Sequence, residues 1–447
     1  MDLKDLLPYY SGRKQAKALR EALKNKSVRT FFLKGLTGSS APVFFSSLAD
    51  SVTVPFAFIL QDADDAGYFY NDLKQILGQE QVLFFPSSYR RSVKYGQRDA
   101  ANEVLRTEVL ARLSEAEEQS PLFIVSYPEA VAELVVSKKN LDERILKLSV
   151  GQTADITETT RRLRDFSFTE VDYVYEPGQY AVRGSILDVY SFSCELPFRI
   201  DFFGDEIDTI RTFEVQDQLS KEQRKTVEIV PELAKLATEK VPFLGFLPAD
   251  SILVVSDFLY VHEVIGRIYE EGFSTQALEE RLSGATEMDR QQIMRDMQRE
   301  AQLCTASRFI EDAAGFRRIE IGQNPTGTPQ ATIQFDITPQ PLFHKNIELL
   351  KQTLEDYVLK GYKLFILADS AKQQQRLREI VEDKIPFTDV SHTLHAGFTD
   401  NEQRVCFFTD HQIFDRFHKY SLRSDTARAG KMALSMKELQ EPSLSLQ

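Results

Sequence analysis

A glycine-rich turn at residues 35–42 has some of the residue types that cradle a phosphate. The segment GLTGSSAP, with Gly35 and Gly38, lies between an apolar run and a helical pattern. A working loop needs G-x-x-x-x-G-K-[ST], in which amides hold phosphate, lysine reaches the outer phosphates and the hydroxyl binds Mg²⁺. Ala41 stands where the lysine belongs, and Pro42, which has no N–H, stands where the hydroxyl belongs. Taken alone, the turn is simply structural.

A second candidate follows the apolar run Ile252–Val255, after which come Ser256 and Asp257. A strand ending in Asp-Glu supplies the Mg²⁺ ligand and the water-activating group of nucleotide-driven motors. Asp257 is a single carboxylate, and its alternative role is to cap the following helix. The positions of this degenerate nucleotide site, where we expect no cofactor to bind, are Gly35, Gly38, Ala41, Ser256 and Asp257.

The histidine and cysteine spacing indicates neither a metal centre nor a catalytic set. His392 and His395 lie in the segment SHTLH without a cysteine or glutamate at metal-ligand spacing, and His411 and His418 flank an aromatic turn. We expect all four to be structural or exposed, with no metal bound. The three cysteines show no CxxC spacing, which favours a reducing, cytoplasmic setting.

The elements that must position these residues follow an α/β pattern at first. Strands are expected at 29–33, 55–60, 81–85 and 122–125, and helices at about 65–77, 99–115 and 128–136. This alternation of strands and helices predicts a parallel sheet covered by helices. The pattern returns after residue 231 with a strand at 251–255.

Between these parts, from about 148 to 230, the pattern alternates with period two and is punctuated by glycines. Phe198, Ile200 and Phe202 fall on one face of a strand, whereas Arg199 falls on the other. The alternation predicts an antiparallel, β-rich domain with one solvent-facing sheet face.

A helix is expected from Thr286, its cap, to about Cys304. Its apolar stripe, which we expect in the core, is Ile293, Met294, Met297, Ala301 and Cys304. A last α/β unit follows, with helices at 343–359 and 370–382 and strands at 363–368 and 404–409.

The charge balance favours a protein partner over nucleic acid. The 447 residues carry 54 lysines and arginines against 67 aspartates and glutamates, a net charge of −13. A general nucleic-acid binder carries a basic face, so the charge disfavours a DNA-binding platform. The basic segment Arg416–Lys431 is expected to be a solvated linker, and its alternative is contact with nucleic acid or polymerase. We find no signal-peptide pattern and no apolar run long enough to cross a membrane.

Several motifs resemble UvrB, the helicase-like subunit of bacterial nucleotide excision repair. Residues 35–42 and 255–259 correspond to its GVTGTGKT loop and its VDESH strand with the chemical groups deleted. Residues 180–189, YAVRGSILDV, resemble its FRVRGDVVEI, and residues 198–207, FRIDFFGDEI, resemble its IRVEFFGDEI.

A UvrB-like chain with a degenerate nucleotide site resembles the N-terminal half of the transcription-repair coupling factor (Mfd) family. The pattern from Glu176 to Phe213 carries this resemblance, and residues 409–416, TDHQIFDR, agree with a run in the domain that follows. The resemblance implies a module that recruits UvrA to RNA polymerase stalled at damaged DNA. It also implies that this chain does not include the motor domains in which ATP and Mg²⁺ act. The domains that bind polymerase are likewise expected outside this chain. Between Tyr89 and Asp99 there is no room for the tyrosine-rich hairpin with which UvrB probes damage, so contact with damaged DNA is expected to be indirect.

The resemblance also implies a partner surface on the β-rich sheet. UvrB meets UvrA there through arginines, whose positions are held by Arg183 and Arg199, whereas Ala181 replaces a third. Both arginines alternate with apolar neighbours, so we expect them to project from the solvent-facing side, where a guanidinium fork suits carboxylates. Tyr180 completes the predicted partner-binding set. The alternative is that these are ordinary solvated charges on an exposed strand.

The predicted fold class is α/β, with a degenerate RecA-like, UvrB-type domain, an inserted antiparallel β-rich domain and a second small α/β domain. The predicted boundaries are 1–147 and 231–337 for the split domain, 148–230 for the UvrA-binding domain, 338–430 for the small domain and 431–447 for a linker or tail. We expect a UvrA-docking module that is no enzyme itself, within a parent protein that is an ATP-dependent DNA translocase. The alternative is an active UvrB-like ATP-dependent helicase or excinuclease subunit, against which Ala41 and Ser256 argue.

Overall fold

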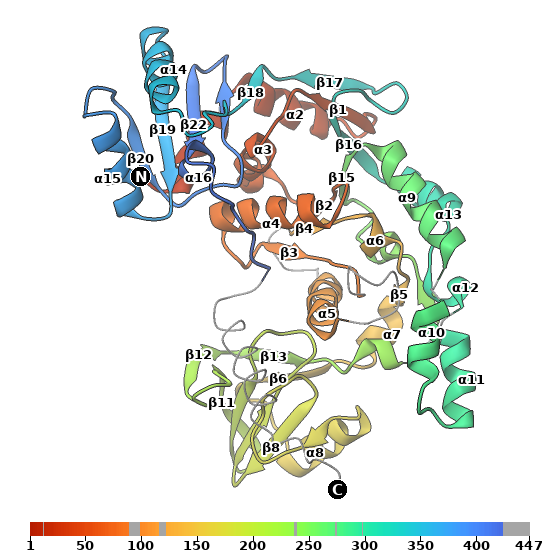
Figure 1. Ribbon diagram of the computed structural model, residues 1–447. Coiled ribbons are helices and arrows are strands. Elements are labelled where there is room, and N and C mark those ends of the chain that lie inside the picture. The colour runs from red at the N-terminus through yellow and green to blue at the C-terminus, as the bar shows by residue number, and fades with distance from the viewer. Residues whose placement is uncertain are drawn as a thin grey trace, which may run out of the picture.

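The structure is a computed structural model that describes residues 1–11, 13–88, 99–115, 122–236, 239–272, 275–296 and 298–422. Figure 1 shows three bodies: a central α/β domain, a β-rich domain at one end, and a small α/β domain beside the central sheet. The expectations for the segment after Tyr89, for Met297, for the basic segment beyond residue 422 and for the tail lie outside the described residues.

The central domain is built on a seven-stranded sheet in which all neighbouring strands are parallel. Its strands, in spatial order, are β17 (Ala331–Gln334), β1 (Thr30–Lys34), β16 (Arg317–Gly322), β15 (Ile252–Ser256), β2 (Phe56–Ile59), β4 (Phe123–Ser126) and β3 (Val82–Phe84). Strands that follow the β-rich domain in sequence, β15 and β16, pair between β1 and β2, which precede it. The central sheet is therefore completed by chain from both sides of the insertion.

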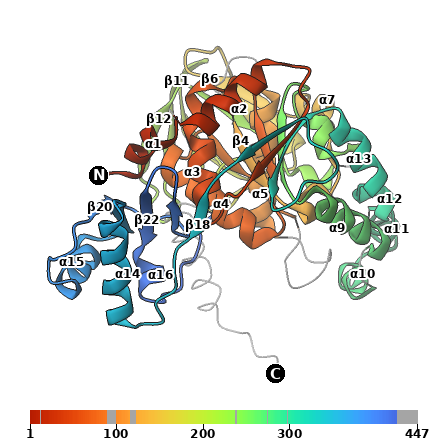
Figure 2. The ribbon, with the colours of Figure 1, turned by 90° about the horizontal axis from the view of Figure 1, so that it is seen from above.

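Helices lie on both sides of the central sheet (Figure 2). The longer ones are α2 (Lys14–Lys24), α3 (Ser40–Ser47), α4 (Ala63–Leu77), α5 (Ala100–Ser114), α9 (Phe258–Glu271) and α13 (Ala306–Ala314). Shorter elements are η1 (Leu3–Leu6), α1 (Pro8–Ser11), η2 (Ala49–Ser51), α7 (Lys138–Asp142), η3 (Leu233–Lys235) and η4 (Phe243–Phe246). Strand β2, Phe56–Ile59, is buried at every position. Because helices cover both faces of this sheet, all four residues of the strand must be apolar.

The β-rich domain has a six-stranded sheet that is antiparallel except between its first two strands. The strands, in sequence order, are β7 (Thr169–Glu170), β8 (Gln179–Arg183), β9 (Ile186–Val189), β10 (Phe198–Phe203), β11 (Glu206–Phe213) and β12 (Ser220–Arg224). Helix α8 (Ile156–Asp165) and the pair β6 (Leu146–Ser149) and β13 (Thr226–Ile229) contribute to the same core as the inner sheet face.

The small domain has a five-stranded sheet in the order β18, β21, β22, β19, β20. Its elements are β18 (Ile337–Pro339), α14 (Ile347–Leu359), β19 (Lys363–Ala368), α15 (Ala371–Ile380), β20 (Thr388–Ser391), β21 (Phe398–Asp400), β22 (Val405–Thr409) and α16 (Asp410–Ile413). It is joined to the N-terminal segment by a buried ion pair between Arg13 and Asp400, at 2.7 Å, and by Tyr9, whose ring meets that of Phe365 edge to face. The parallel sheet and the separate antiparallel sheet confirm the predicted fold class.

Two predicted helices differ from the structure. The helix expected at 128–136 ends after one turn, α6 (Pro128–Val131), and Val135–Val136 instead forms strand β5, which pairs with β14 (Lys240–Val241). Two valines side by side, both buried here, suit an extended strand better than a helix end.

The helix expected from Thr286 to Cys304 is divided into α11 (Glu287–Asp296) and α12 (Arg299–Gln302). Thr286 does cap α11, because its hydroxyl accepts the amide of Asp289 at 3.3 Å. The core prediction for the apolar stripe is wrong at Met294 and Ala301, which are exposed, and is confirmed at Cys304, which is buried. The physical reason is that α10 (Thr275–Leu282) and α11 pack on each other at the outer edge of the molecule, away from the central sheet (Figure 1).

Candidate functional site

The two halves of the degenerate nucleotide site lie at the same edge of the central sheet. The turn at 35–39 follows β1, and Asp257 follows β15, with the single strand β16 between them. Parallel strands place such loops together at their carboxyl ends, where α/β proteins bind ligands. The fold therefore brings together the positions that the sequence suggested.

The chain itself fills the space against the glycine-rich turn. The Ser39 amide donates to the carbonyl of Ala396 at 2.8 Å, and the Ala396 amide donates back to the Ser39 hydroxyl at 2.9 Å. Gly38 has φ +56°, and a Cβ placed there would lie 3.0 Å from the Ala396 oxygen and 3.1 Å from that of Gly397. The Ser39 amide, which could face a phosphate, thus faces the backbone of the small domain. We name residues 395–397 the plug.

Asp72 on α4 ties the turn to the plug. One carboxylate oxygen accepts the Ser39 hydroxyl at 2.6 Å, and the other accepts the His395 amide at 2.9 Å. Burial raises the pKa of Asp72 to about 7, although both hydrogen bonds lower it. This buried carboxyl group would meet an incoming phosphate with repulsion whenever it is ionised.

The remaining positions of the degenerate site have structural roles. Gly35 has φ +97°, and a Cβ there would lie 2.4 Å from the Phe335 oxygen, so only glycine fits the turn. Asp257 caps α9, because its carboxylate accepts the Tyr260 amide at 3.2 Å. The helix-cap alternative for Asp257 is confirmed. Ala41 is buried in α3, and Ser256 ends β15.

The side of the β-rich sheet that is turned away from its core is organised around Asp188 on β9. The strand register places Ala181, Asp188, Arg199 and Arg211 side by side across four strands. Asp188 is fully buried. Its two carboxylate oxygens accept hydrogen bonds from Nε and Nη2 of Arg199, at 2.9 and 3.0 Å. Its second oxygen also accepts Arg183 at 2.5 Å. A buried carboxylate between two guanidinium groups satisfies its charge inside the protein.

Arg199 does not project from the sheet as expected. Its side chain is 14 % exposed, since it lies over the ring of Phe213 at 4.4 Å and donates to the Gln218 carbonyl at 2.8 Å. The loop that carries Gln218 covers this part of the face, which period-two alternation could not show. Arg199 therefore shapes the face from within.

Tyr180 is also placed differently from the prediction. It belongs to the inner face, is 1 % exposed, and is part of the β-rich core with Leu187 and Ile200. Alternation explains this position, because residue 180 must face opposite to Ala181 and Arg183. Tyr180 therefore has almost no accessible surface that a partner could contact.

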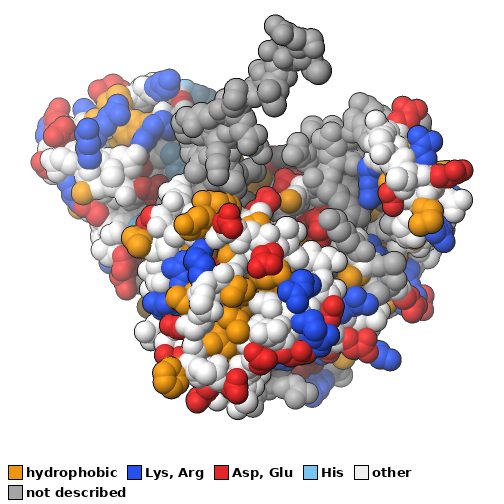
Figure 3. Space-filling model, turned by 90° about the horizontal axis from the view of Figure 1, so that it is seen from below, with side chains coloured by type: hydrophobic (Ala, Val, Ile, Leu, Met, Phe, Trp, Pro, Cys, Tyr) orange, Lys and Arg blue, Asp and Glu red, His pale blue; other side chains and the backbone are white. Residues whose placement is uncertain are grey.

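Arg183 is the predicted residue that remains accessible. Its side chain is 41 % exposed, donates to the Asp172 carbonyl at 2.8 Å, and lies over the ring of Tyr173 at 5.1 Å. Tyr173 is itself exposed, as is Leu219, which follows Gln218. We call Tyr173, Arg183 and Leu219, with the buried Asp188–Arg199 pair beneath them, the outer face. Figure 3 views the end of the molecule formed by the β-rich domain, where apolar side chains gather among charges of both signs.

Sequence reasoning missed Tyr173 and Arg211. Tyr173 precedes the strand it covers, so no alternation pattern assigns it to the sheet. Arg211 lies opposite Arg199 on the same face, and its Nε is buried without a hydrogen bond to any described residue. Its place in the period-two pattern of β11 was the available signal.

Comparison with known proteins bears directly on this domain. Residues 146–234 match the family described as the UvrB interaction domain. The outer face lies wholly within the matched residues. The match starts within β6 and ends after β13, so it spans the β-rich sheet and its covering elements.

The chain is also similar to curated proteins of two kinds. It is 29 % identical over 213 residues to the transcription-repair-coupling factor of Bacillus subtilis and 24 % identical over 212 residues to that of Escherichia coli. These matches cover 48 % and 47 % of this chain but 17 % and 18 % of those proteins. It is 23 % identical over 226 residues to the UvrABC system protein B of Thermotoga neapolitana, covering 48 % of this chain and 34 % of that protein.

These matches confirm the resemblance read from the motifs. Residues 146–234 are similar to the UvrB interaction domain, and the chain matches about a fifth of the length of the coupling factors. Within the described residues, no helix has the length and apolar character needed to span a membrane.

Proposed function

We propose that this chain is the docking part of a transcription-repair coupling protein, and that its β-rich domain binds UvrA. The observation that carries the proposal is the match of residues 146–234 to the UvrB interaction domain. The similarity to transcription-repair-coupling factors supports a setting in which UvrA is brought to RNA polymerase stalled at damaged DNA. In this proposal polymerase contacts parts of the parent protein that this chain does not include.

The proposal includes the loss of nucleotide chemistry from this chain. The plug occupies the amide of Ser39, Ala41 supplies no cation, and Asp257 is engaged as a helix cap. ATP and Mg²⁺ would then act in motor domains elsewhere in the parent protein. These features support a docking role over the alternative of an active UvrB-like helicase subunit.

The outer face is the proposed contact surface for UvrA. Arg183 offers an accessible guanidinium beside the exposed ring of Tyr173, a pairing enriched at the centres of protein interfaces. Asp188, itself fixed by Arg199, accepts a hydrogen bond from Arg183, which reduces the entropy that Arg183 loses when a partner carboxylate binds it. An acidic group on UvrA is the complementary chemistry.

Binding to purified UvrA, measured by calorimetry or biolayer interferometry, tests this surface. Arg183→Glu and Tyr173→Ala should each weaken binding at least tenfold, because each removes an accessible anchor. Arg161→Glu is the matched control, since Arg161 is an exposed arginine on α8, the helix that covers the inner face. If Arg183→Glu and the unmutated chain bind UvrA with equal affinity, the contact lies elsewhere. If the unmutated chain does not bind UvrA, the docking proposal itself is overturned.

Nucleotide turnover separates the docking role from the motor alternative. The purified chain with Mg²⁺-ATP should release no phosphate above the buffer rate, with or without DNA. ATP hydrolysis by the unmutated chain that disappears in Gly38→Asp, a change at the plugged turn, would instead establish the active helicase subunit.

A further inference from the structure

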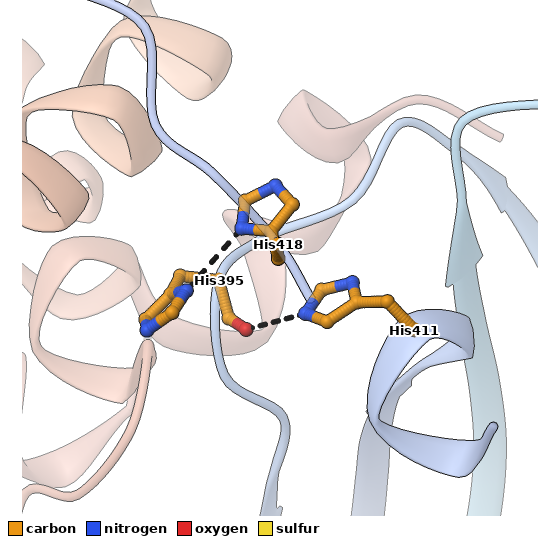
Figure 4. Close-up of side chains that lie close together, drawn as sticks. All are labelled: His395, His411 and His418. Carbon is orange, nitrogen blue, oxygen red and sulfur yellow. Dashed lines mark hydrogen bonds between the residues drawn. The ribbon is translucent and has the colours of Figure 1, made fainter. Parts of the chain in front are cut away.

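Three of the six histidines in the sequence meet at one place in the small domain. His395 lies between β20 and β21, His411 lies on α16, and His418 follows α16 (Figure 4). One ring nitrogen from each residue lies within 4.8 Å of one from each of the other two. The residues are 16 and 7 positions apart, which is why their spacing in sequence gave no signal.

The closest pair already has the separation of two metal ligands. The Nδ1 atoms of His395 and His418 share a hydrogen bond at 3.2 Å, in which one ring donates and the other accepts. Two imidazole nitrogens bound to one zinc ion at 2.0–2.1 Å with tetrahedral angles lie about 3.3 Å apart. A cation between these rings would displace the shared proton with little change in the distance between the two nitrogens.

The surrounding contacts orient the rings as ligand-supporting contacts do. His411 Nε2 must donate to the carbonyl of His395, at 2.7 Å, which leaves a lone pair on the His411 Nδ1. Metal-binding histidines commonly donate their other N–H to a backbone carbonyl in this way. Tyr68 on α4 stacks on the ring of His395 at 3.5 Å, and its hydroxyl donates to the His418 carbonyl at 2.9 Å.

Burial and a nearby carboxylate set the charge around the three rings. Burial lowers the pKa of His395 and of His411 to about 4. Burial lowers the pKa of His418 as well, while the carboxylate of Asp369 acts in the opposite direction on His411 and His418. Asp369 would thus offset part of the charge of a bound ion.

We propose that His395, His411 and His418 bind one divalent transition-metal ion, with zinc as the ion and water as its fourth ligand. Three imidazoles are a donor set that suits zinc. His411, whose ring stacks on that of His418 at 4.4 Å, offers its Nδ1 as the third ligand. The ion fastens the segment after α16 to His395 of the plug, and so to the degenerate turn. This inference stands apart from UvrA binding.

Zinc binding by the untagged, metal-free chain tests the site. A Zn²⁺ titration against a chromophoric chelator should show one tight site per chain. His395→Gln, His411→Gln and His418→Gln should each weaken it at least tenfold, because each removes one of three ligands. His262→Gln and His344→Gln, elsewhere in the molecule, are matched controls that should leave it unchanged.

Folding and coordination are checked in the same variants. Circular dichroism without metal should show that His418→Gln is folded, and excess Zn²⁺ should raise the melting temperature of the parent but not of this variant. Co²⁺ should give a visible absorption band of histidine coordination with the parent only. The inference is overturned if the parent binds no zinc, if the triad variants bind it as tightly as the parent, or if the controls lose it equally.

Discussion

At the scale of single residues, the outer face depends on one buried carboxylate. Asp188 contributes no exposed surface, yet it sets the positions of both Arg183 and Arg199. Removing one member of a buried ion pair leaves an uncompensated charge, which costs more than the pair itself contributes. The residue most important for the face is therefore one that a partner cannot touch.

Asp188→Asn should destabilise the β-rich domain by about 3 kcal/mol, because two guanidinium groups lose their counter-charge. Urea unfolding followed by circular dichroism measures this loss. Asp201→Asn is the control, since Asp201 lies on the same face and accepts the Ser185 hydroxyl at 3.2 Å. Similar unfolding midpoints for the two variants would contradict the role given to Asp188.

At the scale of elements, the plug explains why Gly38 is needed. A side chain there would strain a backbone with φ +56° and would also press on two carbonyl oxygens of the plug. Gly327 has φ +75° in the same domain, but a Cβ there would meet nothing within 4 Å. A side chain at Gly327 would therefore add backbone strain alone, whereas one at Gly38 would add both strain and crowding.

Gly38→Ala should lower the free energy of unfolding more than Gly327→Ala does, by about 1–2 kcal/mol, because it adds crowding to the same strain. Chemical denaturation of both variants measures the difference. Equal losses would mean that the plug yields freely and does not fill the turn firmly.

The α10–α11 pair makes a further prediction at this scale. Met288 on α11 is 84 % exposed and Met294 is also exposed. Met294→Gln should therefore change the free energy of unfolding by no more than about 0.5 kcal/mol. Its melting temperature should stay close to that of the unmutated chain. Phe309→Ala on α13 should cost about 3–5 kcal/mol, since Phe309 is buried against the ring of Phe258. A large loss from Met294→Gln would restore the core prediction.

At the scale of the whole molecule, acidic side chains gather where the central and β-rich domains meet. A cavity of about 530 Å³ there is lined by residues of both domains, including Glu108, Glu195 and Glu228. Burial, with Glu195 nearby, raises the pKa of Glu108 to about 7. Burial, with a hydrogen bond that protonated Glu228 donates to Glu115, raises the pKa of Glu228 to about 8.

The sign of the pH effect follows from these shifts. Between the ordinary glutamate pKa of 4.5 and about 8, the folded chain holds a proton on Glu228 that the unfolded chain has lost. The stability that depends on this proton is present below pH 4.5 and is lost as the pH rises toward 8. Alkaline conditions therefore weaken this junction.

Glu228→Gln should raise the melting temperature relative to the parent at pH 8.5 more than at pH 5.5, because glutamine needs no proton. Differential scanning calorimetry at both pH values measures the gap. Glu263→Gln on α9, an exposed glutamate, is the control. A gap that does not change with pH would remove Glu228 as the cause.

Much of the architecture could be predicted from the sequence, because local patterns determine local structure. Continuous apolar runs such as Phe56–Ile59 gave the parallel strands, alternation in Phe198–Phe203 gave the antiparallel sheet, and Asp257 was recognised as a helix cap. The motifs also pointed to the UvrB resemblance that the comparisons confirm. The loss of lysine at the glycine-rich turn needed no structure to be seen.

Only the tertiary structure decided which surfaces are free and which distant residues meet. Arg199 and Tyr180 had the right types for a contact surface, but a covering loop and the inner core enclose them. The plug and the histidine cluster join segments more than 300 and up to 23 residues apart, respectively. Periodicity reports the face on which a side chain lies, whereas burial depends on what packs over that face, and this is fixed by contacts remote in sequence.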